Sequence, residues 1–152
     1  MTAVENEVEN WSVATDVLLL SAQLVEAIQE GIARRGFRDV RPVHGFAFAR
    51  ISAGDATIAA LAEYLGVTKQ AAAQLVRQLE ERGYVARQPH PLDARATLLT
   101  LTSSGVACTR AAEAAASGAV ERWRPVLGEQ RFTQLQLALR AIVRPGPLRP
   151  SW

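Results

Sequence analysis

The chain has 152 residues, of which 49% are hydrophobic, so it can form a sizeable core and lacks the composition of a disordered protein. Seventeen Lys and Arg against fifteen Asp and Glu give a net charge of only +2, which excludes the strongly basic balance of a non-specific nucleic-acid binder. The charge is uneven, because residues 1–30 hold six acids and no base, whereas residues 31–54 hold five arginines and one acid.

The N-terminal segment 12–35 is predicted to form one long helix with a broad apolar arc. Its apolar residues recur at helical spacing, and a helix apolar over so wide an arc must pack on more than one neighbour. The main stripe is Val17, Leu20, Leu24 and Ile28. A short helix over 42–51, opened by a proline, should follow.

Residues 57–82 predict two short amphipathic helices joined by a tight turn. Thr57 is the candidate N-cap of the first helix, and Gly66 supplies the left-handed residue at its end. Thr68 then caps the second helix, which should run to about Arg82.

The second helix has two distinct faces. One side gathers Ala72, Leu75, Val76 and Leu79, which must face a core. The other side gathers Lys69, Gln70, Ala73, Gln74 and Arg77. Lysine, arginine and glutamine reach base edges or phosphates when a helix lies in the major groove of DNA. The alternative is an ordinary core helix with a solvated polar face.

Two β-prone runs, 84–87 and 97–101, follow this helix and enclose a proline-marked loop over 88–95. Two antiparallel strands directly after a recognition helix make a wing. Arg95 at its tip can enter a minor groove, and Asp93 either orients that arginine or braces the loop. The residues expected to contact DNA are Thr57, Thr68, Lys69, Gln70, Ala73, Gln74, Arg77, Arg87 and Arg95.

Four segments in this region, residues 61–69, 79–85, 93–95 and 101–105, together resemble the winged-helix core of the multiple-antibiotic-resistance regulator (MarR) family. The resemblance covers roughly residues 40–145. It implies a mainly α fold with a small two-stranded β wing, a winged helix-turn-helix with N- and C-terminal dimerisation helices. It also implies a dimeric transcription factor, usually a repressor, that binds pseudo-palindromic operators and is often released by small aromatic or phenolic effectors.

The resemblance suggests a division of the chain. Residues 1–152 form a single MarR-like domain, with a DNA-binding lobe over 40–102, dimerisation helices over 12–35 and 103–143, and an irregular tail over 144–152. An intramolecular three-helix bundle is the alternative explanation for the terminal apolar stripes. Two departures from the family pattern, Ala71 and Ala73 on the recognition helix, indicate few direct base contacts there.

The resemblance also implies an effector pocket where the dimer helices meet the DNA lobe. Trp11, His44 and Arg50 are candidate lining residues, since an aromatic ring, an imidazole and a cation suit a phenolate or carboxylate. Alternatively, His44 is a helix-surface residue and Trp11 anchors the dimer. Cys108 stands alone in an alanine-rich stretch, which favours a small buried hydrophobe over the oxidant sensor found in some family members.

Enzyme motifs for nucleotide binding, metalloprotease chemistry and paired-cysteine metal sites do not occur in the sequence. His44 and His90 lie in different contexts, so no metal or cofactor is expected. There is no signal-peptide pattern and no uninterrupted run of 18 apolar residues, which predicts a cytoplasmic protein without a membrane partner. The prediction is a non-enzymatic, sequence-specific regulator that binds double-stranded operator DNA as a homodimer; the alternative is a winged-helix module that binds protein and not DNA.

Overall fold

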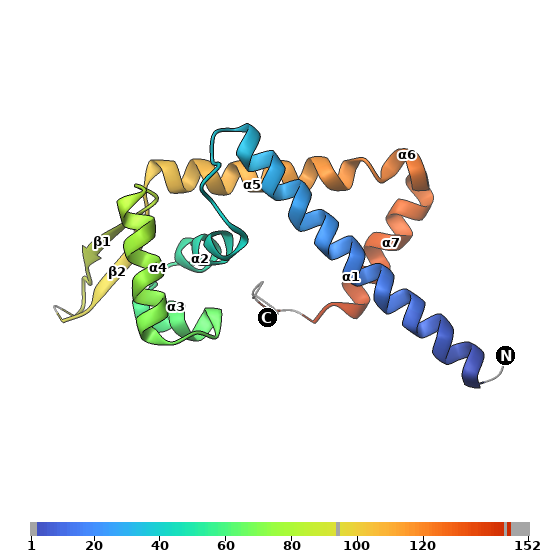
Figure 1. Cartoon of the computed structure of the whole chain (residues 1–152), viewed down its shortest axis with the longest axis horizontal. Coiled ribbons are helices and arrows are strands. Elements are labelled where there is room, and N and C mark those ends of the chain that lie inside the picture. Colours follow the sequence, from blue (N-terminus) through green and yellow to red (C-terminus); the bar gives the residue numbers. More distant parts are fainter. Residues whose placement is uncertain (1–2, 94, 145, 147–152) are drawn as a thin grey trace.

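The computed structural model describes residues 3–93, 95–144 and 146, with side chains from residue 5 onward. A compact lobe of short helices and a sheet lies at one end of an elongated molecule, and long helices extend from it (Figure 1). The elements, in chain order, are α1 (Ala3–Arg34), α2 (Pro42–Ser52), α3 (Ile58–Leu65), α4 (Lys69–Glu81), β1 (Val85–Pro89), β2 (Thr97–Leu101), α5 (Ser103–Glu121), α6 (Arg124–Leu127) and α7 (Glu129–Ile142).

The two longest helices, α1 and α5, cross and pack against each other (Figure 1). Their closest approach depends on small residues, because a Cβ atom placed on Gly31 would collide with the Cβ of Ala115. Helix α1 begins about nine residues before the predicted start at residue 12. Its first turns contain several exposed acids and no base, and acidic side chains near a helix N-terminus favour helix formation.

The lobe is built from α2, α3, α4 and the sheet around one core. Thr57 and Thr68 cap α3 and α4 as predicted, since each hydroxyl accepts a backbone N–H at 3.1 Å. Gly66 ends α3 with φ 68° and ψ 32°, the left-handed conformation predicted for it. The core is centred on fully buried side chains from several elements: Phe48, Ile51, Leu61, Val76 and Leu79.

The wing is an antiparallel pair in which Val85 lies opposite Leu101 and Pro89 opposite Thr97. The first strand extends further than predicted, because Gln88 and Pro89 belong to β1 rather than to the loop. The N–H of Leu99 donates to the carbonyl of Ala56 at 2.7 Å, which ties β2 to the segment before α3.

Three helices form the C-terminal part of the described chain. Pro125 lies in the first turn of the short helix α6, where a proline costs no hydrogen bond. Helix α7 follows at Glu129 and, among the described residues, has no buried side chain. Most of the tail predicted to be irregular, residues 144–152, lies outside the described residues.

The N-terminal two thirds of α1 expose large apolar side chains, including Trp11 at 73% and Leu18 at 70%. Over Glu5–Arg34 the helix is long and apolar enough to cross a membrane, judged by length and composition alone, with a mean hydropathy of 1.3 in its most apolar window. None of that window is buried within the protomer. The sequence survey for an uninterrupted apolar run missed this property, because scattered polar residues divide the window.

We expect Leu79→Ala to destabilise the protein by about 2–5 kcal/mol, since it removes a fully buried leucine and leaves a cavity in the lobe. Urea unfolding at a fixed protein concentration measures the loss. Leu92→Ala is the matched control, because Leu92 is 92% exposed in the wing loop and should change the free energy of unfolding by less than about 0.5 kcal/mol. Equal effects of the two substitutions would contradict the assigned core.

Candidate DNA interface and effector cavity

Helix α4 presents a polar face that no other element of the lobe covers. Its apolar stripe, Ala72, Val76 and Leu79, is buried in the core. The opposite side exposes four long polar side chains, and among the described residues none of them forms an ion pair: Lys69, Gln70, Gln74 and Arg77. Ala73 lies half-buried at the edge of this face. The face can therefore donate and accept hydrogen bonds without breaking an ion pair among the described residues.

The two predicted threonines lie at the N-termini of α3 and α4. Each hydroxyl oxygen is used as a cap, but the hydroxyl proton of each stays available as a donor. Helix N-termini also direct unpaired backbone N–H groups outward, which suits a phosphate. Contact of Thr57 and Thr68 with DNA stays a prediction.

Arg87, predicted to contact DNA, is exposed but forms an ion pair within the protein. Its Nε lies 2.8 and 3.0 Å from the two carboxylate oxygens of Glu80, an ion pair with about a third of each side chain exposed. The pair joins the last turn of α4 to the outer face of β1. Arg87 therefore braces the wing against the recognition helix, and a direct DNA contact by Arg87 stays a prediction.

The wing tip is a compact turn with its arginine exposed. The backbone N–H of Arg95 donates to Oδ1 of Asp93 at 2.9 Å, and the N–H of Ala96 donates to the carbonyl of Asp93 at 3.0 Å. Asp93 thus braces the loop through the backbone, the second of its two predicted roles. Within the described part of the chain, the guanidinium of Arg95 has no ion-pair partner.

The three candidate effector residues do not come together within the protomer. Trp11 lies on the exposed N-terminal part of α1. The guanidinium of Arg50 donates to the carbonyls of Gly54 and Asp55, at 2.8 and 3.5 Å, where it closes the C-terminal end of α2. His44 is buried at the opposite end of α2. A pocket lined by all three residues stays a prediction, and within one chain His44 and Arg50 instead form hydrogen bonds with backbone groups at opposite ends of α2.

His44 has a structural role that neither sequence interpretation gave it. Its side chain is 1% exposed, and its Nδ1 accepts the backbone N–H of Arg41 at 3.0 Å at the start of α2. Burial, followed by the charges of Arg82 and Arg41, lowers the pKa of His44 to about 4, against a smaller opposing effect of Asp39. The imidazole is therefore neutral at physiological pH, which the accepting role of Nδ1 requires.

A different cavity opens between α1, α2 and α5. It has a volume of about 340 Å³ and an almost entirely apolar lining, with polar groups only from Gln29, Thr109 and Glu113. Its apolar lining residues include Val25, Ile28, Ile32, Val40, Phe46 and Ala112. No lysine, arginine or histidine lines it.

Cys108 also lines this cavity, although its side chain is only 1% exposed. Burial raises the pKa of its thiol to about 11, and Asp39 contributes in the same direction. The reactive thiolate is therefore scarce near neutral pH. Burial of Cys108 as a small apolar residue agrees with the sequence interpretation.

A polar contact that the sequence analysis missed joins the loop after α1 to the start of the wing. The hydroxyl of Tyr84 donates to Oδ1 of Asp39 at 2.7 Å, and Nη1 of Arg82 donates to the backbone carbonyl of Asp39 at 2.9 Å. Asp39 lies more than forty residues from both partners in the sequence. In the sequence Asp39 stands out as the only acid in residues 31–54, but this does not show which residue it forms a hydrogen bond with.

Comparison with known proteins identifies the lobe. Residues 41–96 match the MarR family model, which confirms the resemblance, and members of this family are transcriptional regulators rather than enzymes. None of the curated proteins matches the sequence.

Solved structures share the fold. RV1404 from Mycobacterium tuberculosis is 26% identical, covers 86% of this chain and 90% of its own, and has a TM-score of 0.74. A variant of S. aureus MepR bound to an oligodeoxyribonucleotide is 19% identical, with coverage of 86% and 94% and a TM-score of 0.66. CouR from Rhodococcus jostii, bound to p-coumaroyl-CoA, is 20% identical, with coverage of 90% and 94% and a TM-score of 0.62. The predicted mainly α, winged helix-turn-helix fold is confirmed.

The low pKa of His44 predicts a loss of stability in mild acid. Below pH 6.5 the imidazole of the unfolded chain takes up a proton, whereas the folded one, with a pKa of about 4, does not. The unfolded state is therefore favoured as the pH falls from 6.5 towards 4, by about 2 kcal/mol at pH 5. Urea unfolding at pH 7.5 and pH 5 measures this loss. His44→Gln should show a smaller loss between the same two pH values; an unchanged difference would contradict the assignment.

Proposed function

We propose that this chain, whose residues 41–96 carry a MarR-family winged helix, is a sequence-specific DNA-binding transcriptional regulator. It acts as a homodimer on a pseudo-palindromic operator in the cytoplasm, as a repressor that responds to a small effector. The observation that carries the proposal is the exposed face of α4, where amide and basic side chains project from a helix whose other side is buried.

The chemistry of this face assigns separate roles to its residues. Gln70 and Gln74 can each pair with an adenine edge through an amide, and Arg77 can pair with guanine or a phosphate. Lys69, in the first turn of α4, suits a phosphate. Arg95 reaches the adjacent minor groove from the wing tip, where a guanidinium responds to shape and charge more than to base identity.

A second copy of the chain is the proposed cover for the exposed apolar surface of α1 and α7. Trp11 and Leu18 lie one heptad apart on α1, and Leu137 and Ile142 are exposed on α7. The charges complement each other, because residues 1–30 hold six acids and no base, whereas residues 122–144 hold five arginines and one acid. An anionic membrane surface would repel the acidic helix, which favours a protein partner.

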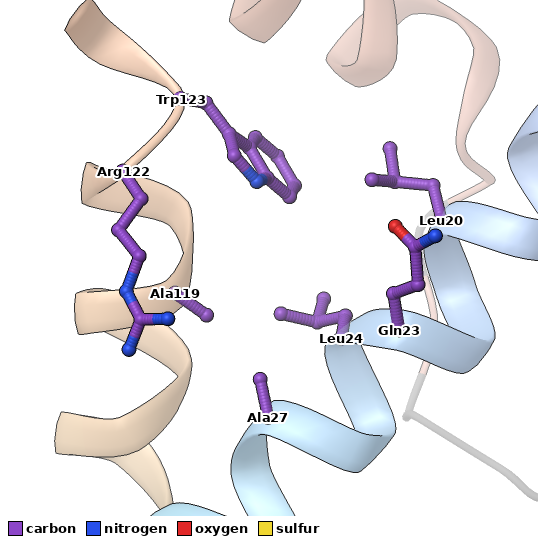
Figure 2. A pocket seen from close by; sticks show the side chains of 7 residues that line it. All are labelled: Leu20, Gln23, Leu24, Ala27, Ala119, Arg122 and Trp123. Carbon is purple, nitrogen blue, oxygen red and sulfur yellow. The ribbon is translucent and has the colours of Figure 1, made fainter.

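A hollow between α1 and the end of α5 fits the same proposal. Its volume is about 160 Å³, and the indole of Trp123 faces Leu20 and Leu24 across it (Figure 2). Ala27 and Ala119 line its inner end (Figure 2). A side chain from a second copy would fill this hollow and complete the packing between the two helices.

The cavity between α1, α2 and α5 is the proposed effector site. Because Glu113 is the only charged residue in its lining, the cavity suits an uncharged phenolic or aromatic compound and disfavours a carboxylate. CouR was solved with p-coumaroyl-CoA. Thermal-shift measurements with neutral phenols and matched benzoates decide the point: we expect stabilisation by the phenols, and stabilisation by the benzoates alone would refute this choice of ligand.

The rival function is a protein-docking winged helix without DNA binding. Selection from a random duplex library by the full-length protein separates the two functions. We expect an enriched palindrome whose half-sites lie about one helical turn apart, bound in a salt-sensitive manner. Failure to enrich any duplex at low salt would favour the protein-docking function.

Substitutions on α4 and at the wing tip should divide into two kinds of effect. We expect Gln74→Ala to relax the preference at one base pair per half-site, at a cost of about 1–3 kcal/mol against the preferred base. Lys69→Ala and Arg95→Ala should weaken all duplexes alike and reduce the salt slope by about one unit each. Arg110→Ala, which removes one exposed charge on α5, outside α4, the wing and the surface proposed to meet a second copy, controls for net charge. Wild-type preference and affinity in all three variants would exclude reading by this helix.

Leu18→Glu should separate the subunits, because it places a charge in the proposed apolar contact of α1. Sedimentation equilibrium should give a dimer for the wild type and a monomer for the variant at the same concentration. Leu92→Glu, the same change at an exposed wing leucine, should remain dimeric. A monomeric wild-type protein would contradict the homodimer.

A further inference from the structure

Tyr84 is the point where four segments of the lobe meet. Its backbone N–H donates to the carbonyl of Leu79 at 2.9 Å, and its carbonyl accepts the N–H of Thr102 at 3.0 Å. Its residue position, directly before β1, sets where the wing begins. The end of α4, the start of the wing and the start of α5 are thus fixed relative to one tyrosine backbone.

The side chain of Tyr84 extends this junction to a fourth segment, the loop between α1 and α2. Its ring lies 6.2 Å from that of Phe37 and 5.7 Å from that of Phe48, centroid to centroid. Its hydroxyl donates to Asp39. Burial and this hydrogen bond raise the pKa of Tyr84 to about 12, so the phenol remains a donor at any physiological pH.

The contacts of Asp39 differ in strength. The Tyr84 hydrogen bond, at 2.7 Å to a carboxylate, belongs to the strong charge-assisted class. The Arg82 guanidinium donates to the backbone carbonyl of Asp39 and would do so for any residue there. The ion pair between Arg82 Nε and Asp39 Oδ2 is 3.9 Å long and partly exposed, so it contributes little. The Asp39 carboxylate therefore acts mainly through Tyr84.

We propose that Asp39 is a positioning residue for DNA binding: its carboxylate, by holding the hydroxyl of Tyr84, fixes the angle of the wing relative to the end of α1. The inference rests on the proposed function, because the angle matters only when the wing and α4 engage one duplex together. Asp39 touches no predicted DNA-contacting side chain. Its effect must therefore pass through Tyr84 into β1 and on to Arg95 at the tip.

The residues that follow Asp39 connect the Asp39–Tyr84 hydrogen bond to the cavity between α1, α2 and α5. Val40, the next residue, is buried, and together with Pro42 it lines the cavity between α1, α2 and α5. In this short loop Val40 thus forms part of the cavity wall, and Asp39, the residue before it, holds the wing through Tyr84. A ligand that displaced Val40 would bear directly on the bond between Asp39 and Tyr84.

Hydrogen exchange on the full-length protein without DNA tests the linkage by itself. Tyr84→Phe keeps the ring contacts and Asp39→Asn keeps an acceptor oxygen, so both variants should fold. We expect faster exchange over residues 82–101 in Asp39→Ala and Tyr84→Phe, and near wild-type exchange in Asp39→Asn. Glu30→Gln, which breaks an exposed ion pair on α1, is the control. Unchanged exchange over 82–101 in both Asp39→Ala and Tyr84→Phe would overturn the proposal.

Fluorescence anisotropy on the duplex selected by the wild-type protein tests the consequence for DNA binding. We expect Asp39→Ala and Tyr84→Phe each to weaken binding about three- to tenfold at a temperature where both are fully folded, and the double variant to be no weaker than either. Asp39→Asn should restore most of the affinity.

A cycle with Arg95 distinguishes positioning from general destabilisation. In the Asp39→Ala background, Arg95→Ala should cost clearly less affinity than in the wild type, because the wing no longer directs the arginine to the groove. Lys69→Ala, at the far end of α4, should cost the same in both backgrounds. Full additivity of the Asp39 and Arg95 changes would overturn the proposal. If the wild type selects no duplex, the proposed function fails, and hydrogen exchange alone decides whether Asp39 positions the wing.

Discussion

The lobe depends on the packing of one thirteen-residue helix, α4, which has to be apolar on one side and polar on the other. Ala72, Val76 and Leu79 are fully buried, and their burial provides the hydrophobic free energy that fixes the rotation of the helix about its axis. Because the rotation is fixed from inside, the outward direction of Gln74 and Arg77 follows from the core. The same packing that stabilises the lobe therefore orients its polar face.

The base of the wing is held both by apolar packing, since Val85 and Leu99 are buried in the core, and by polar contacts. The Leu99 N–H bonds to the segment before α3, and Arg87 pairs with Glu80 at the end of α4. A two-stranded sheet alone is marginally stable, so such contacts decide its angle. Apolar packing therefore anchors the base of the wing, and the directional bonds fix its orientation.

The sequence was sufficient where structure follows from local chemistry. Thr57, Gly66 and Thr68 marked the ends of α3 and α4, because capping depends on residues only a few positions apart. Contacts between distant segments were not accessible in this way. Nothing in the spacing of Asp39 and Tyr84, 45 residues apart, indicates that they meet.

The contacts that the candidate effector residues make within one chain were also not accessible from the sequence. A histidine and an arginine near a pocket suggest ligand binding. In this chain the two side chains lie at opposite ends of α2, where they form hydrogen bonds with backbone groups that the helix leaves without partners. The exposed stripe of α7 shows the opposite limit. Its apolar spacing predicted a helix that something covers, whereas α7 has no buried side chain among the described residues.

The close crossing at Gly31 lies near the C-terminal end of α1, so a small tilt of the helix at the crossing moves its N-terminus by a large distance. Between Ala3 and Gly31 the helix is about 42 Å long, at 1.5 Å per residue, while only three residues continue beyond Gly31 to Arg34. A tilt of about five degrees at the crossing would therefore move the N-terminus by about 4 Å, a displacement comparable to the rise of one base pair. A larger residue at position 31 would force such a tilt by separating the helix axes. In the proposed homodimer, the absence of a single methyl group at position 31 would then set how the two copies are aligned.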